Sequence, residues 1–141
     1  MKGQFDDSAA WRGRPSPSLA DIEALAAEAY ARLPEHFRSQ CENLVIQVTD
    51  FPTEEVLEQI NVETEFDLLG LFQGVGLPFQ SASVLDPLPN MVWLYRRPIL
   101  DYWAEHEESL GAIVTHVLVH EIGHHLGLSD DDMTAIEAAA D

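Results

Sequence analysis

The chain has 141 residues, of which 46% are hydrophobic, and its 25 acidic and seven basic residues give a formal net charge of −18. This length predicts one domain with one modest core, and no apolar run approaches the roughly 18 residues that a membrane span needs. The negative charge excludes nucleic acid and anionic membrane surfaces as partners, because both bind through Lys and Arg. Peptide or protein substrates with basic or extended segments are compatible with it.

The cysteine content and the N-terminal segment indicate a compartment. Cys41 is the only cysteine, which excludes a disulfide framework and a zinc cluster built on thiolates. Residues 1–17 mix Gly, Ser, Pro and charged residues without an apolar stretch, so they predict a flexible leader and no secretory signal. We therefore expect a cytoplasmic monomer in which residues 18–141 form a single domain.

The first half of the chain predicts two helices and one strand. Ser18, followed by Asp21, is typical of a capping-box variant at the start of a helix. Apolar residues follow at helical spacing up to Pro34, which ends the helix. The β-branched residues of 44–49 predict a strand. Thr53 then caps a second helix, which is acidic.

The second half predicts two strands, a loop and three helices. The segment 66–76 is rich in Leu and Phe, but its three glycines mark an edge strand or a close backbone approach. Prolines make 77–90 a loop, and MVWLYR at 91–96 is the clearest strand. Pro98 opens the next helix. The helices expected in this half cover about 99–109, 111–126 and 130–140. This interleaving of helices with at most three strands predicts an α+β protein with a small sheet.

The segment from His120 to Asp130 contains the residues typical of a metal site. His120 and His124 are four residues apart on a predicted helix, so both imidazoles project from one face and can bind one ion. Glu121 lies about 100° further round that helix, where a carboxylate can take a proton from metal-bound water without binding the ion. Two imidazoles, one carboxylate and one open position are typical of catalytic zinc. We therefore expect one Zn²⁺ per chain.

The third protein ligand is expected just after this helix. Gly127 allows the left-handed conformation that ends a helix and turns the chain back. Asp130 follows His124 by six residues, where the extended motif H-E-x-x-H-x-x-G-x-x-H/D has its last ligand. In the competing interpretation, Ser129 and Asp132 form a capping box and Asp130 only favours the positive end of the last helix. The other candidates for this ligand are Glu137, His125 and Asp131.

Other features carry weaker signals. His116 lies one turn before His120, either near the metal or as an exposed helical histidine. Arg96 and Arg97 are the only basic residues after position 38, and they either pair with nearby carboxylates or hold a substrate carboxylate. The glycines within 68–74 leave room for a substrate backbone to pair with that strand.

These residues resemble the small bacterial zincin-like metallopeptidase family, single-domain acidic proteins with the motif H-E-x-x-H-x-x-G-x-x-D. The resemblance covers about residues 20–135. Its further segments are Leu33-Pro34-Glu35, LLGLFQGVGLP at 68–78 and VWLYRRPI at 92–99. It implies a minimal zincin-like fold, in which the active-site helix packs on a small sheet of about three strands with flanking helices. The zinc ligands that it implies are His120, His124 and Asp130, and the general base is Glu121.

The function predicted from the sequence is a zinc-dependent metallopeptidase that hydrolyses peptide bonds through a Glu121-activated, zinc-bound water. The alternative is a zinc-binding regulatory or interaction domain with little or no turnover. A metal-dependent RNA hydrolase is disfavoured because such enzymes need a basic track and lack a glutamate at this position of the motif. A nucleic-acid mimic is disfavoured because it would leave the metal motif without a role.

Overall fold

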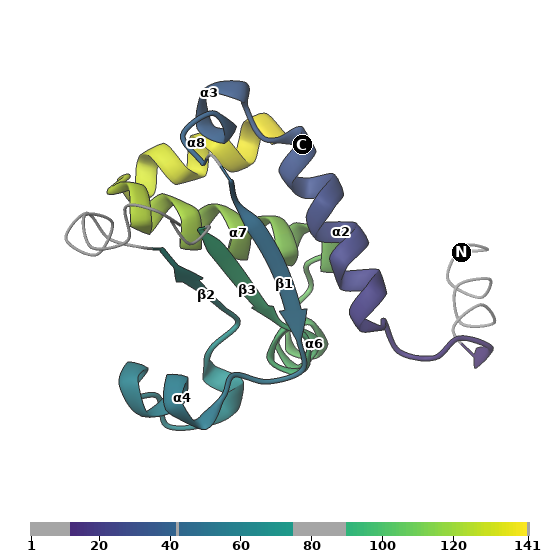
Figure 1. Ribbon diagram of the computed structural model, residues 1–141. Coiled ribbons are helices and arrows are strands. Elements are labelled where there is room, and N and C mark those ends of the chain that lie inside the picture. Colours follow the sequence, from purple (N-terminus) through teal and green to yellow (C-terminus); the bar gives the residue numbers. More distant parts are fainter. Residues whose placement is uncertain (1–11, 42, 75–89, 141) are drawn as a thin grey trace.

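The structure is a computed structural model that describes residues 12–41, 43–74 and 90–140. In these residues it contains six α-helices and a three-stranded mixed sheet (Figure 1), which confirms the α+β class. The helices are α2 (Leu19–Arg32), α3 (Glu35–Arg38), α4 (Glu54–Ile60), α6 (Arg96–Glu105), α7 (Leu110–Leu126) and α8 (Asp130–Ala140), with a 3₁₀ turn η1 (Glu65–Asp67). The strands are β1 (Val45–Thr49), β2 (Gly70–Gln73) and β3 (Met91–Tyr95). None of the described helices is long and apolar enough to cross a membrane.

Local hydrogen bonds set the helix starts that the sequence predicts. The Ser18 hydroxyl accepts the N–H of Asp21 at 3.1 Å, and the Asp21 carboxylate accepts the N–H of Ser18 at 2.8 Å. This capping box begins α2, which ends two residues before Pro34. Thr53 caps α4 in a similar way, because its hydroxyl accepts the N–H of Val56 at 3.2 Å. The predicted starts of both helices are confirmed.

The start of α6 differs from the predicted one. The helix runs from Arg96 to Glu105, whereas Pro98 predicts a helix over about 99–109. Pro98 is the third residue of α6 and still lies in the first turn, where an N–H has no partner within the helix. A proline is therefore tolerated there, and its presence does not mark the first helical residue.

The segment predicted as an edge strand is shorter than expected. Within 66–76, the end of η1 is followed by β2, which has only four residues. The predicted loop over 77–90 lies outside the described residues except for its last residue. Of the predicted leader over 1–17, only residues 12–17 are described.

The sheet has the strand order β1-β3-β2, so β2 lies at an edge. β3 pairs with β1 in parallel and with β2 in an antiparallel ladder. The N–H of Tyr95 donates to the C=O of Leu69 at 3.0 Å, which makes these two residues a hydrogen-bonded pair. Because hydrogen-bonded and non-hydrogen-bonded pairs alternate along an antiparallel ladder, Gly70 and Phe72 direct their own N–H and C=O groups away from β3. These groups lie along the outer edge of the sheet.

Helices α2 and α7 pack on the sheet (Figure 1), and the hydrophobic core lies between these layers. The core contains side chains from all three elements that have no exposed surface: Ile22 and Ala26 of α2, Val92 and Leu94 of β3, and Val114, Leu118 and Ile122 of α7. One face of α7 is therefore committed to the core. The face that carries His116, His120 and His124 lies outside this core and is available for a site.

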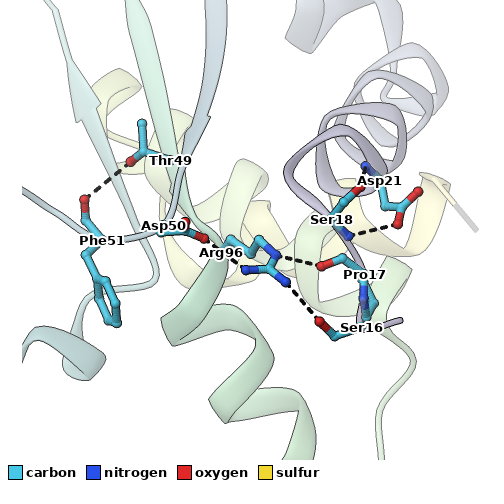
Figure 2. Close-up of polar contacts among 8 residues, drawn as sticks. All are labelled: Ser16, Pro17, Ser18, Asp21, Thr49, Asp50, Phe51 and Arg96. Carbon is cyan, nitrogen blue, oxygen red and sulfur yellow. Dashed lines mark hydrogen bonds and ion pairs between the residues drawn. The ribbon is translucent and has the colours of Figure 1, made fainter. Parts of the chain in front are cut away.

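Arg96 joins three parts of the chain at the start of α6 (Figure 2). Its Nε donates to the C=O of Pro17 at 2.6 Å, its Nη1 to Asp50 Oδ1 at 3.0 Å, and its Nη2 to Ser16 Oγ at 2.9 Å. We call these four residues the Arg96 cluster. Of the two interpretations of this arginine, the structure shows the pairing with a nearby carboxylate. These hydrogen bonds also link residues 16 and 17 to the end of β1 and the start of α6.

Candidate functional site

Helix α7 has a defined cap at each end. The Ser109 hydroxyl accepts the N–H of Ala112 at 3.1 Å at the start. Gly127 ends the helix in the left-handed conformation, with φ of 76°. Beyond it, the N–H of Leu128 donates to the C=O of Gly123 at 2.9 Å, which satisfies a carbonyl that the helix leaves free. The predicted reversal of the chain at Gly127 is confirmed.

Helix α8 packs closely against α7 after this reversal. A Cβ atom on Gly123 would lie 2.4 Å from Met133 Sδ, so any larger residue would require the Met133 side chain to move. Ser129 and Asp132 form the predicted capping box, with the Ser129 hydroxyl accepting the Asp132 N–H at 3.1 Å. The returning helix brings the side chain of Glu137 beside the histidines of α7.

Three histidines form a row along α7. The rings of His116 and His120 lie 3.9 Å apart, centroid to centroid, with a tilt of 33°. The rings of His120 and His124 are edge to face at 5.7 Å. His120 is half-buried, whereas the other two are exposed. We call these three residues and Glu137 the histidine cluster.

Glu137 has a carboxylate oxygen without a hydrogen bond. Its Oε1 lies 2.6 Å from His116 Nδ1 and 3.8 Å from His120 Nε2. This oxygen is buried, and no described residue gives it a hydrogen bond of acceptable geometry. The nearest ligand atoms of His116, His120 and Glu137 all lie within 4.8 Å of one another. Since a buried acceptor without a partner is costly, a cation would stabilise this arrangement.

The surroundings of His120 favour its neutral form. Burial lowers the pKa of His120, and the neighbouring His116 and His124 lower it further. The carboxylates of Glu137 and Asp130 act in the opposite direction without reversing the shift. The neutral imidazole is the form that binds a metal ion. The lowered pKa of His120 therefore favours the form that can act as a ligand.

Glu121 faces the edge strand. Its carboxylate accepts the backbone N–H of Phe72, one of the outward-facing amides of β2. Burial raises the pKa of Glu121, while the neighbouring His124 and this hydrogen bond partly offset the rise. The strand comes this close because of Gly70, where a Cβ atom would lie 2.5 Å from Val117 Cγ1. Helix and edge strand thus position the carboxylate together.

A cavity of about 370 Å³ adjoins this face of α7. Its wall includes His116, His120, Glu121 and His124 of α7 together with Gly70 of β2. The other lining residues are Asp67, Leu69, Tyr102, Glu108, Ile113 and Val117. No described residue of α8 lines it. The cavity is large enough for part of a peptide substrate beside the motif.

Not every predicted site residue lies at this cavity. His120, Glu121 and His124 line one wall of it, as the motif predicts. Asp130 is exposed as the first residue of α8 and is not among the described lining residues, although its charge acts on His120. Its role as a ligand stays a prediction. The structure groups a different carboxylate, that of Glu137, with the histidine row.

A protein-family model described as zincin-like metallopeptidase matches residues 41–140. The chain belongs to this family. The match begins after α3, later than the resemblance noted above, and it continues through α8. No curated protein matches the chain. Membership of the zincin-like family supports zinc binding and a peptidase-type function, and the fold is accordingly a minimal zincin-like one.

The donor atoms of this zincin-like chain fit zinc. They are imidazole nitrogens and carboxylate oxygens without sulfur, a set that zinc accepts in catalytic sites. The unsatisfied Oε1 of Glu137 is the observation that points to a cation, and the lowered pKa of His120 favours the imidazole form that binds one. Sequence reasoning considered His116 and Glu137 separately and missed that they meet. The four-residue spacing of His116 and His120 already places both rings on one face of the helix. The position of Glu137, in contrast, depends on how α8 crosses α7.

Proposed function

We propose that this zincin-like protein is a zinc-dependent peptidase in which Glu121 is the general base. The observation that carries the proposal is that His120, Glu121 and His124 line the same cavity as the edge strand β2. The family match supports the same class of reaction. A cavity between a metal-binding helix and a free strand edge suits an extended peptide.

Zinc is held by His120, His124 and Asp130 in this proposal. When bound, the ion polarises a carbonyl oxygen and lowers the pKa of a water molecule. His120 and His124 are adjacent on one face of α7, with their rings edge to face. Asp130 begins α8 directly after the turn at Gly127, and its charge already acts on His120.

Glu121 accepts a proton from the attacking water and passes it to the leaving amine. The amide of Phe72 orients its carboxylate from the strand side. A carboxylate has about four lone-pair positions, so this single hydrogen bond leaves it able to accept a proton. Burial at the wall of the cavity keeps the group close to the substrate.

The substrate is a peptide that extends β2. Gly70 and Phe72 direct their backbone groups away from β3. The Phe72 N–H donates to Glu121, so an extended chain can pair with the N–H and C=O of Gly70 and with the C=O of Phe72. The segment 68–74 contains two glycines and no basic residue, which leaves the edge open to a close approach. The net charge of −18 favours peptides with cationic segments.

Cleavage of basic, unstructured peptides at near-neutral pH tests this function. We expect cleavage by the zinc-loaded protein, loss of cleavage with a chelator, and recovery when zinc is restored. His120→Ala is the inactive comparison because it removes a metal ligand. Cleavage that a chelator does not affect contradicts the proposal. Full zinc occupancy without any cleavage favours the alternative, a zinc-binding interaction domain.

A further inference from the structure

We infer that His116, His120 and Glu137 form a second cation site for a zinc-type divalent ion, one turn along α7 from the family motif. The motif uses His120 and His124 and gives no role to His116 or Glu137. The second site shares His120 with it. This inference goes beyond the proposed peptidase, since it concerns metal binding by other residues and does not require turnover.

The arrangement of the donor atoms carries the inference. His116 Nδ1 lies 2.6 Å from Glu137 Oε1, and His120 Nε2 lies 3.8 Å from the same oxygen. All three ligand atoms are within 4.8 Å of one another. Zinc binds nitrogen and oxygen at about 2.0–2.2 Å, so one ion can bridge atoms that lie up to about 4 Å apart. The His116 side chain is 55% exposed, which lets it adjust to the ion.

A simple ion pair between His116 and Glu137 explains these observations less well. Although their atoms lie close together, the contact lacks the geometry of a hydrogen bond and leaves the buried Oε1 unsatisfied. His120 Nε2 is too far from this oxygen to donate to it. An ion between the three side chains satisfies the oxygen and both ring nitrogens at once.

The second site lies on the α8 side of the histidine row. Glu137 comes from α8, and no described residue of α8 lines the cavity that contains Glu121. A ring nitrogen has one lone pair, so His120 Nε2 binds one ion at a time. An ion held by His116 and Glu137 through this atom therefore withdraws His120 from the motif. The two sites compete, and the chain keeps one zinc at this row.

Zinc binding by His124→Ala is the test, because this variant disrupts the motif pair and leaves the second site intact. Equilibrium dialysis with metal analysis should give about one zinc per chain. Adding His116→Ala or Glu137→Gln should weaken this binding by about tenfold or more, since even the loss of an outer partner costs 10–100-fold. Adding His125→Ala is the matched control. His125 is exposed on the same helix but stacks on Phe72, with ring centroids 4.0 Å apart, so its loss should leave the affinity unchanged.

Histidine side-chain NMR of His124→Ala gives a second measurement. Added zinc should shift the ring signals of His116 and His120 and leave those of His36 and His106 unchanged. Absence of zinc binding by His124→Ala, or equal affinity after His116→Ala or Glu137→Gln is added, overturns the inference. These readouts need no peptide substrate, so a failure of the proposed peptidase activity would be seen separately.

Discussion

The Arg96 cluster and the histidine cluster are both groups of polar side chains that hold helices in place, but they differ in how completely they are satisfied. Each of the three guanidinium nitrogens of Arg96 donates to an acceptor at 2.6–3.0 Å (Figure 2). In the histidine cluster, the buried Oε1 of Glu137 has no hydrogen bond, and His120 has a lowered pKa. Every guanidinium nitrogen of Arg96 therefore has a partner within the chain, whereas the histidine cluster keeps a buried acceptor without one.

This difference separates a structural role from a binding role. A polar network whose members are all paired stabilises one conformation and has nothing left for a ligand. A group that stays unpaired costs stability, and the cost is recovered when a ligand binds. The Arg96 cluster should therefore matter for folding alone. The histidine cluster and Glu121 should matter for zinc and for catalysis.

Glu121→Gln is expected to have the largest effect. The amide keeps the shape of the side chain but cannot accept a proton, so peptide cleavage should fall by about 10²–10⁴, the usual contribution of a general base. Zinc content and the free energy of unfolding should change little, because Glu121 is not a ligand in the proposal. The measurement is the cleavage rate of a basic peptide at saturating zinc.

Glu108→Gln is the matched control for this variant. Glu108 is a second glutamate in the wall of the same cavity, and it is exposed. The rate should stay within a few-fold of the wild type when it is replaced. Equal losses in the two variants would show that charge in the cavity matters and that Glu121 has no special role. Cleavage persisting in Glu121→Gln would indicate a contaminating protease.

Signals that act within a few residues were predicted correctly from the sequence. The capping boxes at Ser18 and Ser129 and the left-handed Gly127 lie where they were expected, because each depends on hydrogen bonds within one turn of chain. The start of α6 was misplaced because Pro98 fits any residue of a first turn. The short α3 and η1 were missed, since three or four residues are too few to show a period.

The candidate site was predictable only in part, because some of its contacts join elements that are far apart in the sequence. The motif places His120, Glu121 and His124 on one helix, and the structure puts all three at one cavity. The carboxylate that joins them must come from another element, so its identity depends on how α8 crosses α7. Gly123 permits that close crossing through its contact with Met133. Neither the contact nor the outward-facing Phe72 amide has a local sequence signal.

Asp130→Ala is expected to have the next largest effect, on zinc affinity. If Asp130 is a ligand, zinc binding should weaken by about 100-fold when the substitution is made in a His116→Ala background that removes the second site, at the upper end of what outer partners of a metal cost. If it only stabilises the start of α8, the cost is a loss of about 0.3–1 kcal/mol in unfolding free energy. Competition with a chelator of known affinity measures the first effect, and urea unfolding measures the second.

Asp131→Asn is the comparison for Asp130. Asp131 is also exposed in the first turn of α8, so it should share the effect on the helix end and leave zinc affinity unchanged. Unchanged zinc affinity in Asp130→Ala as well would move the third ligand to Glu137 or to water. That result would bring the motif site and the second site onto the same carboxylate.

Arg96→Ala should destabilise the fold without changing the metal site. Its side chain is 17% exposed and makes three hydrogen bonds, so we expect a loss of about 1–2 kcal/mol after allowing for the half-exposed Asp50. Arg97→Ala is the neighbouring control, because exposed Arg97 only lies over the Phe51 ring at 5.5 Å and its loss should cost about 0.5 kcal/mol. Urea unfolding measures both. A change of zinc affinity in Arg96→Ala would contradict the division between the two clusters.

Cys41→Ala should have the smallest effect of these substitutions. It tests whether a residue with a shifted pKa is necessarily part of a functional site. Its thiol is buried and donates to the C=O of Phe37 at 3.5 Å, so it is satisfied like Arg96. Burial raises the pKa of Cys41 above its ordinary value of 9.0, which means that the folded state holds the proton more tightly than the unfolded state. The resulting stability is complete below the unfolded pKa and is lost as pH rises through the folded pKa.

The unfolding free energy of the wild type should therefore fall more steeply above about pH 9 than that of Cys41→Ala, while zinc affinity at neutral pH stays the same in both. Burial raises the pKa of Tyr30 in both proteins, and the charge of Cys41 raises it further in the wild type alone, so the difference between their pH profiles reports the thiol together with its effect on Tyr30. Parallel profiles would show that the buried thiol contributes nothing to the alkaline loss of stability.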